Sequence, residues 1–202
     1  MKKIILALAF LAGSTAVIAS GDEGKTEMAV NTSKSQIEWV GKKLTGEHQG
    51  TFNLKSGTLN IEDGMIQSAN LIIDMTSILV TDEGMDDETK GKLKGHLSSP
   101  DFFNVAEHNT AAFQLTTFKP MKGENGANYE ISGKLTIKGI TQDISFPAKV
   151  DMTKGSVTAT GSLVIDRSKW DIRYGSGSFF DDLGDKVIYD DVEINFNLVA
   201  SK

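Results

Sequence analysis

Cysteine is absent from the 202 residues, and its absence excludes several classes of protein at once. A chain without a thiol has no lipid-modified lipoprotein N-terminus, no disulfide and no thiolate metal site. Histidine is almost as scarce, since His48, His96 and His108 are the only three. No two of them have the i,i+2 spacing of a strand face or the i,i+4 spacing of a helix face. The sequence therefore predicts no metal site and no cofactor.

Motifs of catalysis are missing as well. The chain has no Gly-x-Ser-x-Gly nucleophile elbow, no phosphate-binding loop and no dinucleotide-binding fingerprint. The acidic run from Asp82 to Glu88 lacks the residue order of an EF-hand. We therefore expect no catalytic residues and a protein that is not an enzyme.

Basic residues are in the minority, at 21 against 27 acidic ones, which gives a formal net charge of −6. An acidic surface repels phosphate backbones and anionic lipid headgroups. Nucleic acid is therefore not an expected partner.

A long hydrophobic run occurs only at the N-terminus. Lys2 and Lys3 precede the apolar stretch Ile4–Leu11, and Val17 and Ala19 then occupy the −3 and −1 positions of a leader-peptidase site. This order is that of a secretory signal peptide, and the run is too short for a stable membrane span. We expect cleavage after Ala19, a mature net charge of −8, and a location in the bacterial periplasm or outside the cell. The alternative is an N-terminal anchor that stays in place.

The rest of the chain has the length of one domain. Residues 20–27 are small and charged, and we expect them to be a flexible lead-in. Residues 28–202 are expected to form a single domain without a further membrane span. The sequence is compatible with a homodimer.

Apolar and polar residues alternate through most of this domain. The alternation covers residues 36–40, 65–75, 113–116, 129–138, 144–150, 157–165 and 193–200, with Gln67 as a polar exception on an apolar face. Such segments bury one face only, which is typical of antiparallel strands, and turn residues such as Glu62-Asp63-Gly64 separate them. Either a barrel or a sandwich has this pattern. We favour an antiparallel β-barrel, because closure hides the strand edges.

One segment interrupts the alternation. Residues 82–97 are acidic first and basic later, which suits a helix dipole, and Leu93 and Leu97 fall on one helical face. Ser98-Ser99-Pro100 then ends the helix. We expect a short helix that caps one mouth of the barrel.

The interior of the barrel is expected to contain free volume. Several inward positions are small, namely Ala69, Gly133, Ala148, Ala159, Gly161 and Ala200. Empty apolar volume suits a hydrophobic ligand, although small residues also serve tight strand coiling. The pairs Phe102-Phe103 and Phe179-Phe180 lie outside the alternating stretches, and each pair is expected to plug a barrel end or to line its entrance.

Four ordered blocks resemble the YceI-like, polyisoprenoid-binding family. They are residues 35–52, with Ser35-Gln36-Ile37-Glu38-Trp39-Val40-Gly41-Lys42-Lys43 and Gly46-Glu47-His48-Gln49-Gly50-Thr51-Phe52; residues 96–105, with His96-Leu97 and Asp101-Phe102-Phe103; residues 133–141; and Ile165-Asp166-Arg167-Ser168-Lys169-Trp170. The resemblance implies a lipocalin-like barrel. It also implies that an isoprenoid, either polyprenyl or quinone, or another long-chain lipid, occupies an elongated apolar tunnel.

Twelve residues are candidates for contact with such a ligand. His48, His96 and Arg167 can donate hydrogen bonds to a head group. The expected apolar wall consists of Trp39, Phe52, Leu97, Phe102, Phe103, Phe113, Leu135, Phe146 and Trp170. Arg167 has an alternative role in an ion pair with Asp166 or a loop carboxylate, and His48 an alternative role in fixing the barrel seam.

Three functions remain open on the sequence. The first is a lipid carrier or scavenger. The second is an envelope stress or interaction module whose barrel is filled by its own side chains. The third, ranked last, is a hydrolase or isomerase that acts on a lipid head group through His48 or His96.

Overall fold

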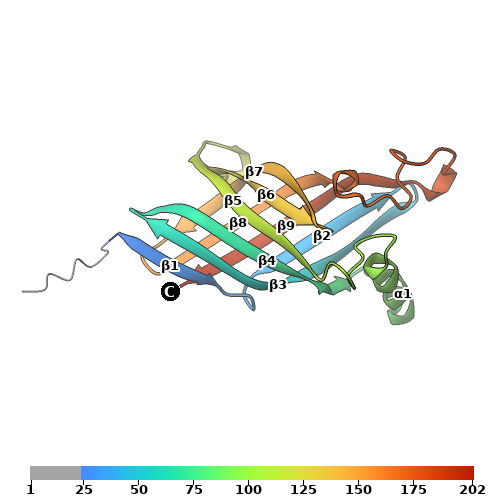
Figure 1. The fold of residues 1–202 in the computed structure, drawn as a ribbon, viewed down its shortest axis with the longest axis horizontal. Coiled ribbons are helices and arrows are strands. Elements are labelled where there is room, and N and C mark those ends of the chain that lie inside the picture. The colour runs from blue at the N-terminus through green and yellow to red at the C-terminus, as the bar shows by residue number, and fades with distance from the viewer. Residues whose placement is uncertain (1–23) are drawn as a thin grey trace, which may run out of the picture.

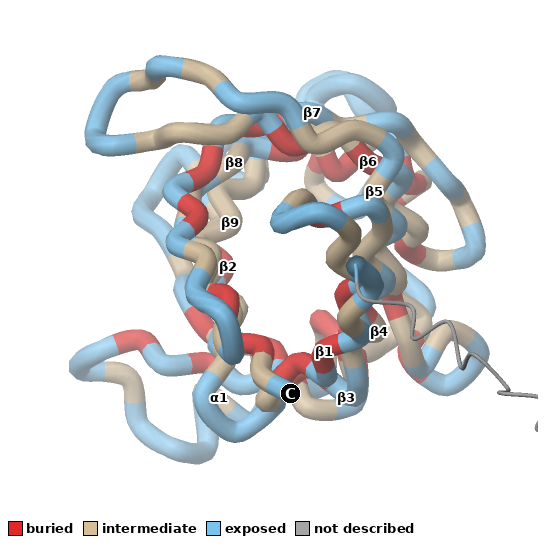
Figure 2. Tube along the Cα trace, turned by 90° about the vertical axis from the view of Figure 1, so that its left-hand side faces the viewer, coloured by how far each residue is buried: buried red, intermediate tan, exposed pale blue. Residues whose placement is uncertain are grey.

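Nine strands form one antiparallel sheet that curls round and closes on itself (Figure 1). This computed structural model describes residues 24–202. The strands are β1 (Lys25–Val30), β2 (Gln36–Lys43), β3 (Gly46–Glu62), β4 (Met65–Val80), β5 (Thr110–Pro120), β6 (Tyr129–Ile137), β7 (Ile140–Met152), β8 (Ser156–Asp166) and β9 (Ile188–Ser201). Their order is β1-β3-β2-β9-β8-β7-β6-β5-β4, and the β3–β4 pairing closes the ring seen end-on in Figure 2. The predicted antiparallel barrel is confirmed.

Strands β1 and β2 follow one another along the same place in the barrel, between β3 and β9. β1 pairs with the second half of β3, where Ala29 faces Thr58, and β2 pairs with the first half, where Ile37 faces Phe52. Both strands also pair with β9. The nine strands therefore make an eight-stranded closed barrel, in which residues 31–35 interrupt one strand.

The expected lead-in is wrong in its last three residues. Lys25, Thr26 and Glu27 already belong to β1 and pair with β3. The strand is anchored by Met28, whose side chain is buried in the barrel core. The predicted signal peptide and its cleavage site lie outside the described residues.

The exception at Gln67 marks a β-bulge. Asn60 faces Ser68 and Ile61 faces Ile66, so β4 contains one residue more than β3 at this point. A bulge of this kind reverses the alternation on one strand. As a result Ile66 is buried and Gln67 is exposed.

The helix covers one end of the barrel, as predicted, but it starts five residues later. α1 spans Asp87–Ser98, and the Asp86 carboxylate caps it by accepting the Thr89 backbone N–H at 2.8 Å. The hydrogen bonds that this carboxylate accepts from the Thr89 backbone N–H and the Thr89 hydroxyl lower the pKa of Asp86. Asp82 is not part of the helix, because its carboxylate is engaged by β3 as described below. Within residues 24–202, no helix has the length and apolar character needed to cross a membrane.

Two of the small inward residues do not leave space. A Cβ built on Gly133 would overlap the Phe113 ring, and one on Gly161 would lie 2.7 Å from Cζ of Phe196. Each glycine therefore lets an aromatic ring from a neighbouring strand lie flat against the barrel wall. Ala69, Ala159 and Ala200 do line a cavity, so the expectation of free volume is right for these three alanines. It is wrong for the two glycines and for Ala148, which is buried and does not line the cavity.

Gly133→Ala tests this arrangement. The added methyl group would also lie 2.6 Å from the Gln114 carbonyl oxygen, so either the Phe113 ring or the backbone must move. We expect a loss of about 1–3 kcal/mol in the free energy of unfolding, measured by urea denaturation.

The control is Gly91→Ala in α1, where a Cβ meets nothing within 4 Å. Because alanine is the better helix former, this variant should be neutral or more stable by up to about 1 kcal/mol. Equal stability of the two alanine variants would contradict the packing described for Gly133.

Candidate functional site

The barrel encloses an apolar cavity of about 450 Å³. Residues from all nine strands and from α1 line it, from Val30 and Ala200 at the end near the C-terminus to Leu97 and Trp170 at the other end. Val30, Val157 and Ala200 are at most 7% exposed, so the end near the C-terminus is closed by packed side chains. Among residues 24–202, no serine, threonine, aspartate or glutamate lines the cavity.

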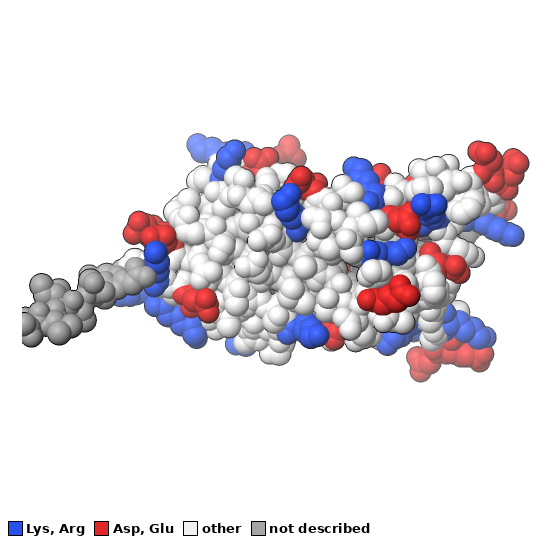
Figure 3. All heavy atoms as spheres, viewed as in Figure 1, with Lys and Arg blue, Asp and Glu red and all other residues white. Residues whose placement is uncertain are grey.

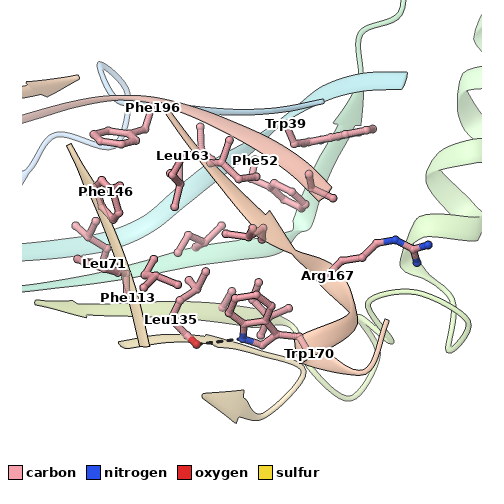
Figure 4. A pocket seen from close by; sticks show the side chains of 18 of the residues that line it. Trp39, Phe52, Leu71, Phe113, Leu135, Phe146, Leu163, Arg167, Trp170 and Phe196 are labelled. Carbon is pink, nitrogen blue, oxygen red and sulfur yellow. Dashed lines mark hydrogen bonds between the residues drawn. The ribbon is translucent and has the colours of Figure 1, made fainter. Parts of the chain in front are cut away.

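Aromatic side chains form much of the wall (Figure 4). The Phe113, Phe146 and Phe196 rings are consecutive neighbours, with centroids 6.0 Å and 5.5 Å apart. Nearer α1, the Phe52 ring meets the Phe103 ring edge-on at 5.8 Å. Such edge-on contacts are favourable between aromatic rings and fix their orientation. The cavity therefore has a defined apolar shape along its length.

The two tryptophans of the wall differ in their hydrogen bonding. Trp170 lies in the 3₁₀ helix η2 (Arg167–Trp170), and its indole N–H donates to the Leu135 carbonyl oxygen at 3.1 Å (Figure 4). Trp39 packs over Gly50, and its buried Nε1 has no hydrogen-bond partner among the described residues. Trp170 thus ties η2 to β6, whereas Trp39 leaves one polar atom of the wall unpaired.

The cavity meets solvent at the end covered by α1, which we call the α1 mouth. It is formed by residues 41–43 of β2, His48 of β3, α1, η2 residues Arg167 and Trp170, and residues Ile172, Tyr174, Ile188 and Tyr189. His96 of α1 contacts the Phe102 and Tyr174 rings edge-on, with centroids 5.1 Å and 4.4 Å away. Tyr174 and Tyr189 are 45% and 46% exposed, so this end is accessible from outside.

His48 is held at the α1 mouth by a buried carboxylate. Its Nδ1 lies 2.6 Å from Oδ2 of Asp82, whose Oδ1 accepts the Gln49 backbone N–H at 2.7 Å. Because a carboxylate only accepts hydrogen bonds, Nδ1 carries the proton and Nε2 remains available. The pair also links β3 to the segment after β4, so His48 combines the predicted cavity position with the alternative role at the barrel seam.

Arg167 uses its donors on the protein itself. Its side chain is 4% exposed, and it donates to the carbonyl oxygens of Tyr189 at 3.1 Å, Ile172 at 2.8 Å and Ile188 at 3.0 Å. Its Nη2 also lies 3.3 Å from Oδ1 of Asp190. Burial lowers the pKa of Arg167, and the Asp190 carboxylate opposes this shift. The geometry favours the alternative structural role, with Asp190 rather than Asp166 as the partner.

Asp190 extends this network into the loop between η2 and β9. Its Oδ2 accepts hydrogen bonds from the hydroxyls of Ser176 and Ser178, at 2.9 Å and 2.6 Å. The same loop contains the 3₁₀ helix η3 (Gly184–Lys186). Arg167 therefore holds together η2, this loop and the start of β9.

All twelve sequence-predicted residues line the cavity. Whether they contact a ligand remains a prediction. Phe102 and Phe103 line the entrance as expected, but Phe179 and Phe180 do not contact the cavity and are 40% and 50% exposed. The expectation for this second pair is wrong, because Phe179 stacks under the Arg173 guanidinium instead, with Cζ 4.9 Å from the ring centroid.

The match to a family model covers nearly the whole of this barrel, residues 28–200, and the model is that of the YceI-like domain. The chain belongs to the YceI-like family. A UPF0312 protein of Pectobacterium atrosepticum is 30% identical over 101 residues, which are 50% of this chain and 47% of that protein. Protein YceI of Escherichia coli is 29% identical over 103 residues, which are 50% and 48% of the two chains. The YceI-like chain spans about half the length of the curated relatives that it matches.

Solved structures are similar over a larger part of the chain. BcnA of Burkholderia cenocepacia superposes with a TM-score of 0.65 at 26% identity, covering 85% of this chain and 99% of BcnA. A polyisoprenoid binding domain from Saccharophagus degradans gives a TM-score of 0.62 at 18% identity, covering 86% and 97%. The likeness to the Saccharophagus degradans domain shows that the two chains share a fold.

Several residues of the YceI-like cavity were missed from the sequence. Phe196 follows the alternation of residues 193–200 and could have been found from that signal. Lys42 and Lys43 both line the cavity although they are neighbours on a strand. The β2–β9 register shifts beside them, because residues 189–191 of β9 lie between the partners of Gly41 and Lys43. A bulge of this kind leaves no recognisable pattern in the sequence.

Arg167→Lys tests the structural role of the guanidinium. A lysine keeps the charge, but a single ammonium group cannot satisfy three carbonyl oxygens that lie in different directions. We expect the free energy of unfolding to fall by about 2–4 kcal/mol in urea denaturation.

Arg173→Lys is the matched control, since Arg173 pairs with Asp171 on the surface and is 57% exposed. Such pairs contribute about 0–1 kcal/mol. A similarly small effect at Arg167 would show that its hydrogen bonds are not needed for the fold.

Proposed function

We propose that this YceI-like protein binds one long-chain lipid inside its barrel, with an isoprenoid as the preferred class. The observation that carries the proposal is the continuous apolar cavity, closed at one end and accessible at the α1 mouth. Its volume of about 450 Å³ lies within the range of small-molecule sites. The polyisoprenoid binding domain from Saccharophagus degradans has the same fold, which supports an isoprenoid here.

The lining supports recognition of the tail by burial. Each methylene group moved from water into an apolar site contributes about 0.8 kcal/mol, so a long tail gains affinity with length. The rings of Phe113, Phe146 and Phe196 give this tail a wall without polar groups. A barrel filled by its own side chains, the second function considered, would leave no such volume.

The same lining favours binding over catalysis. His48 and Asp82 form an oriented pair, but the described residues place no serine or threonine hydroxyl in the cavity wall to act with them as a nucleophile. We propose a carrier or scavenger of lipid rather than an enzyme. The predicted signal peptide at residues 1–19 supports a location in the periplasm or outside the cell.

Ala159→Trp tests the proposal by filling the cavity. Ala159 lines the lumen, so the indole would occupy space meant for the lipid tail. We expect the wild type to take up geranylgeraniol, as seen by native mass spectrometry, and the variant to take up none. A lipid recovered with altered mass would indicate catalysis instead.

The control is Thr160→Trp, one residue along β8, where the side chain is exposed on the outer face. This variant should bind like the wild type. Equal uptake by all three proteins, or no uptake by the wild type, would contradict binding in the barrel.

A further inference from the structure

The charged residues of the cavity all have the same sign. Acidic residues outnumber basic ones in the chain, and on the face shown in Figure 3 side chains of both signs are interspersed. The cavity lining differs, because its charged or titratable residues are Lys42, Lys43, His48, His96 and Arg167, together with two tyrosines. The part of the chain that the structure describes contributes no carboxylate to this lining. All of them lie at the α1 mouth.

Two of these cations are available to a ligand. Lys42 and Lys43 have no carboxylate within 4 Å among the described residues, whereas Arg167 is fully engaged by the protein. Lys43 is half-buried and Lys42 is exposed, and both line the cavity at the end of β2. Their ammonium groups therefore lack a counter-ion at the point where the cavity opens.

The two histidines complete the basic rim of the α1 mouth. Asp82 fixes the His48 ring through Nδ1, which leaves Nε2 unused, and Asp101 lies 3.6 Å from Nε2 of His96. Both carboxylates stand outside the lining, so they orient the imidazoles without placing negative charge in the cavity. An oxygen anion that enters the α1 mouth would therefore meet the ammonium groups of Lys42 and Lys43 and no carboxylate of the described lining.

We infer that the ligand carries an anionic head group, a phosphate or a carboxylate, which sits between Lys42, Lys43 and His48 while the tail fills the barrel. This inference rests on the proposed function and names its ligand class, since it excludes a neutral quinone as the preferred ligand. Charge-assisted hydrogen bonds to such a head group are stronger than those to a neutral oxygen. Because the rim is partly exposed, the preference should weaken with ionic strength.

The test compares two ligands with the same tail, geranylgeranyl phosphate and geranylgeraniol, by isothermal titration. We expect the wild type to bind the phosphate at least about tenfold more tightly than the alcohol, as one or two favourable charge contacts would give. In the double variant Lys42→Gln/Lys43→Gln the ratio of the two affinities should fall towards one. The thermal unfolding midpoint of the variant serves as the check on folding.

Lys55→Gln/Lys119→Gln is the control, because it removes the same charge from exposed positions that do not line the cavity. It should keep the wild-type affinity for both ligands. Equal binding of phosphate and alcohol by the wild type, or an unchanged ratio in Lys42→Gln/Lys43→Gln, would overturn the inference and leave the proposed lipid binding intact. Failure of both ligands to bind would contradict the proposed function itself.

Inorganic phosphate alone provides the last arm of the test. We expect it to displace geranylgeranyl phosphate only weakly, because it lacks the tail. Displacement at concentrations similar to those of the lipid would assign the α1 mouth to a free anion and overturn its role as a lipid head-group site.

Discussion

Pairing of β3 with β4 closes the sheet, and the cavity exists only because of this closure. In a closed barrel of eight strands the interior is just large enough to be filled by side chains or by one small ligand. Here the outcome depends on where the aromatic rings lie. Gly133 and Gly161 allow the Phe113 and Phe196 rings to lie along the wall, so the rings border the lumen and do not cross it.

Polarity divides the cavity into two functional parts. The barrel interior is apolar, and the basic residues gather at the α1 mouth. Three of these basic residues are each paired with an aspartate that lies outside the lining. The pairs are His48 with Asp82, His96 with Asp101 and Arg167 with Asp190. Arg167 organises the backbone around it, whereas the histidines keep one edge near the cavity. This division matches an amphipathic ligand with a long tail and a small polar end.

Alternation in the sequence predicted antiparallel strands that bury one face each, and the need to hide strand edges then favoured a barrel over a sandwich. Alternation failed where the strands are irregular. The register of β9 shifts beside Lys42 and Lys43, and local sequence does not encode this shift. Asp82 was assigned to the helix, since nothing nearby in the chain reveals its contact with His48, 34 residues away. The flattened Phe113 ring likewise depends on a glycine in the neighbouring strand.

A crystal structure with an isoprenoid phosphate that carries bromine at the end of its tail would test the central claim most directly. The anomalous signal of bromine locates the tail independently of any model of the ligand. The account predicts one bromine peak inside the barrel, towards Ala200 and Val157, with the head group at Lys43 and His48. A peak outside the barrel, or a lumen closed by its own side chains with no peak, would contradict it.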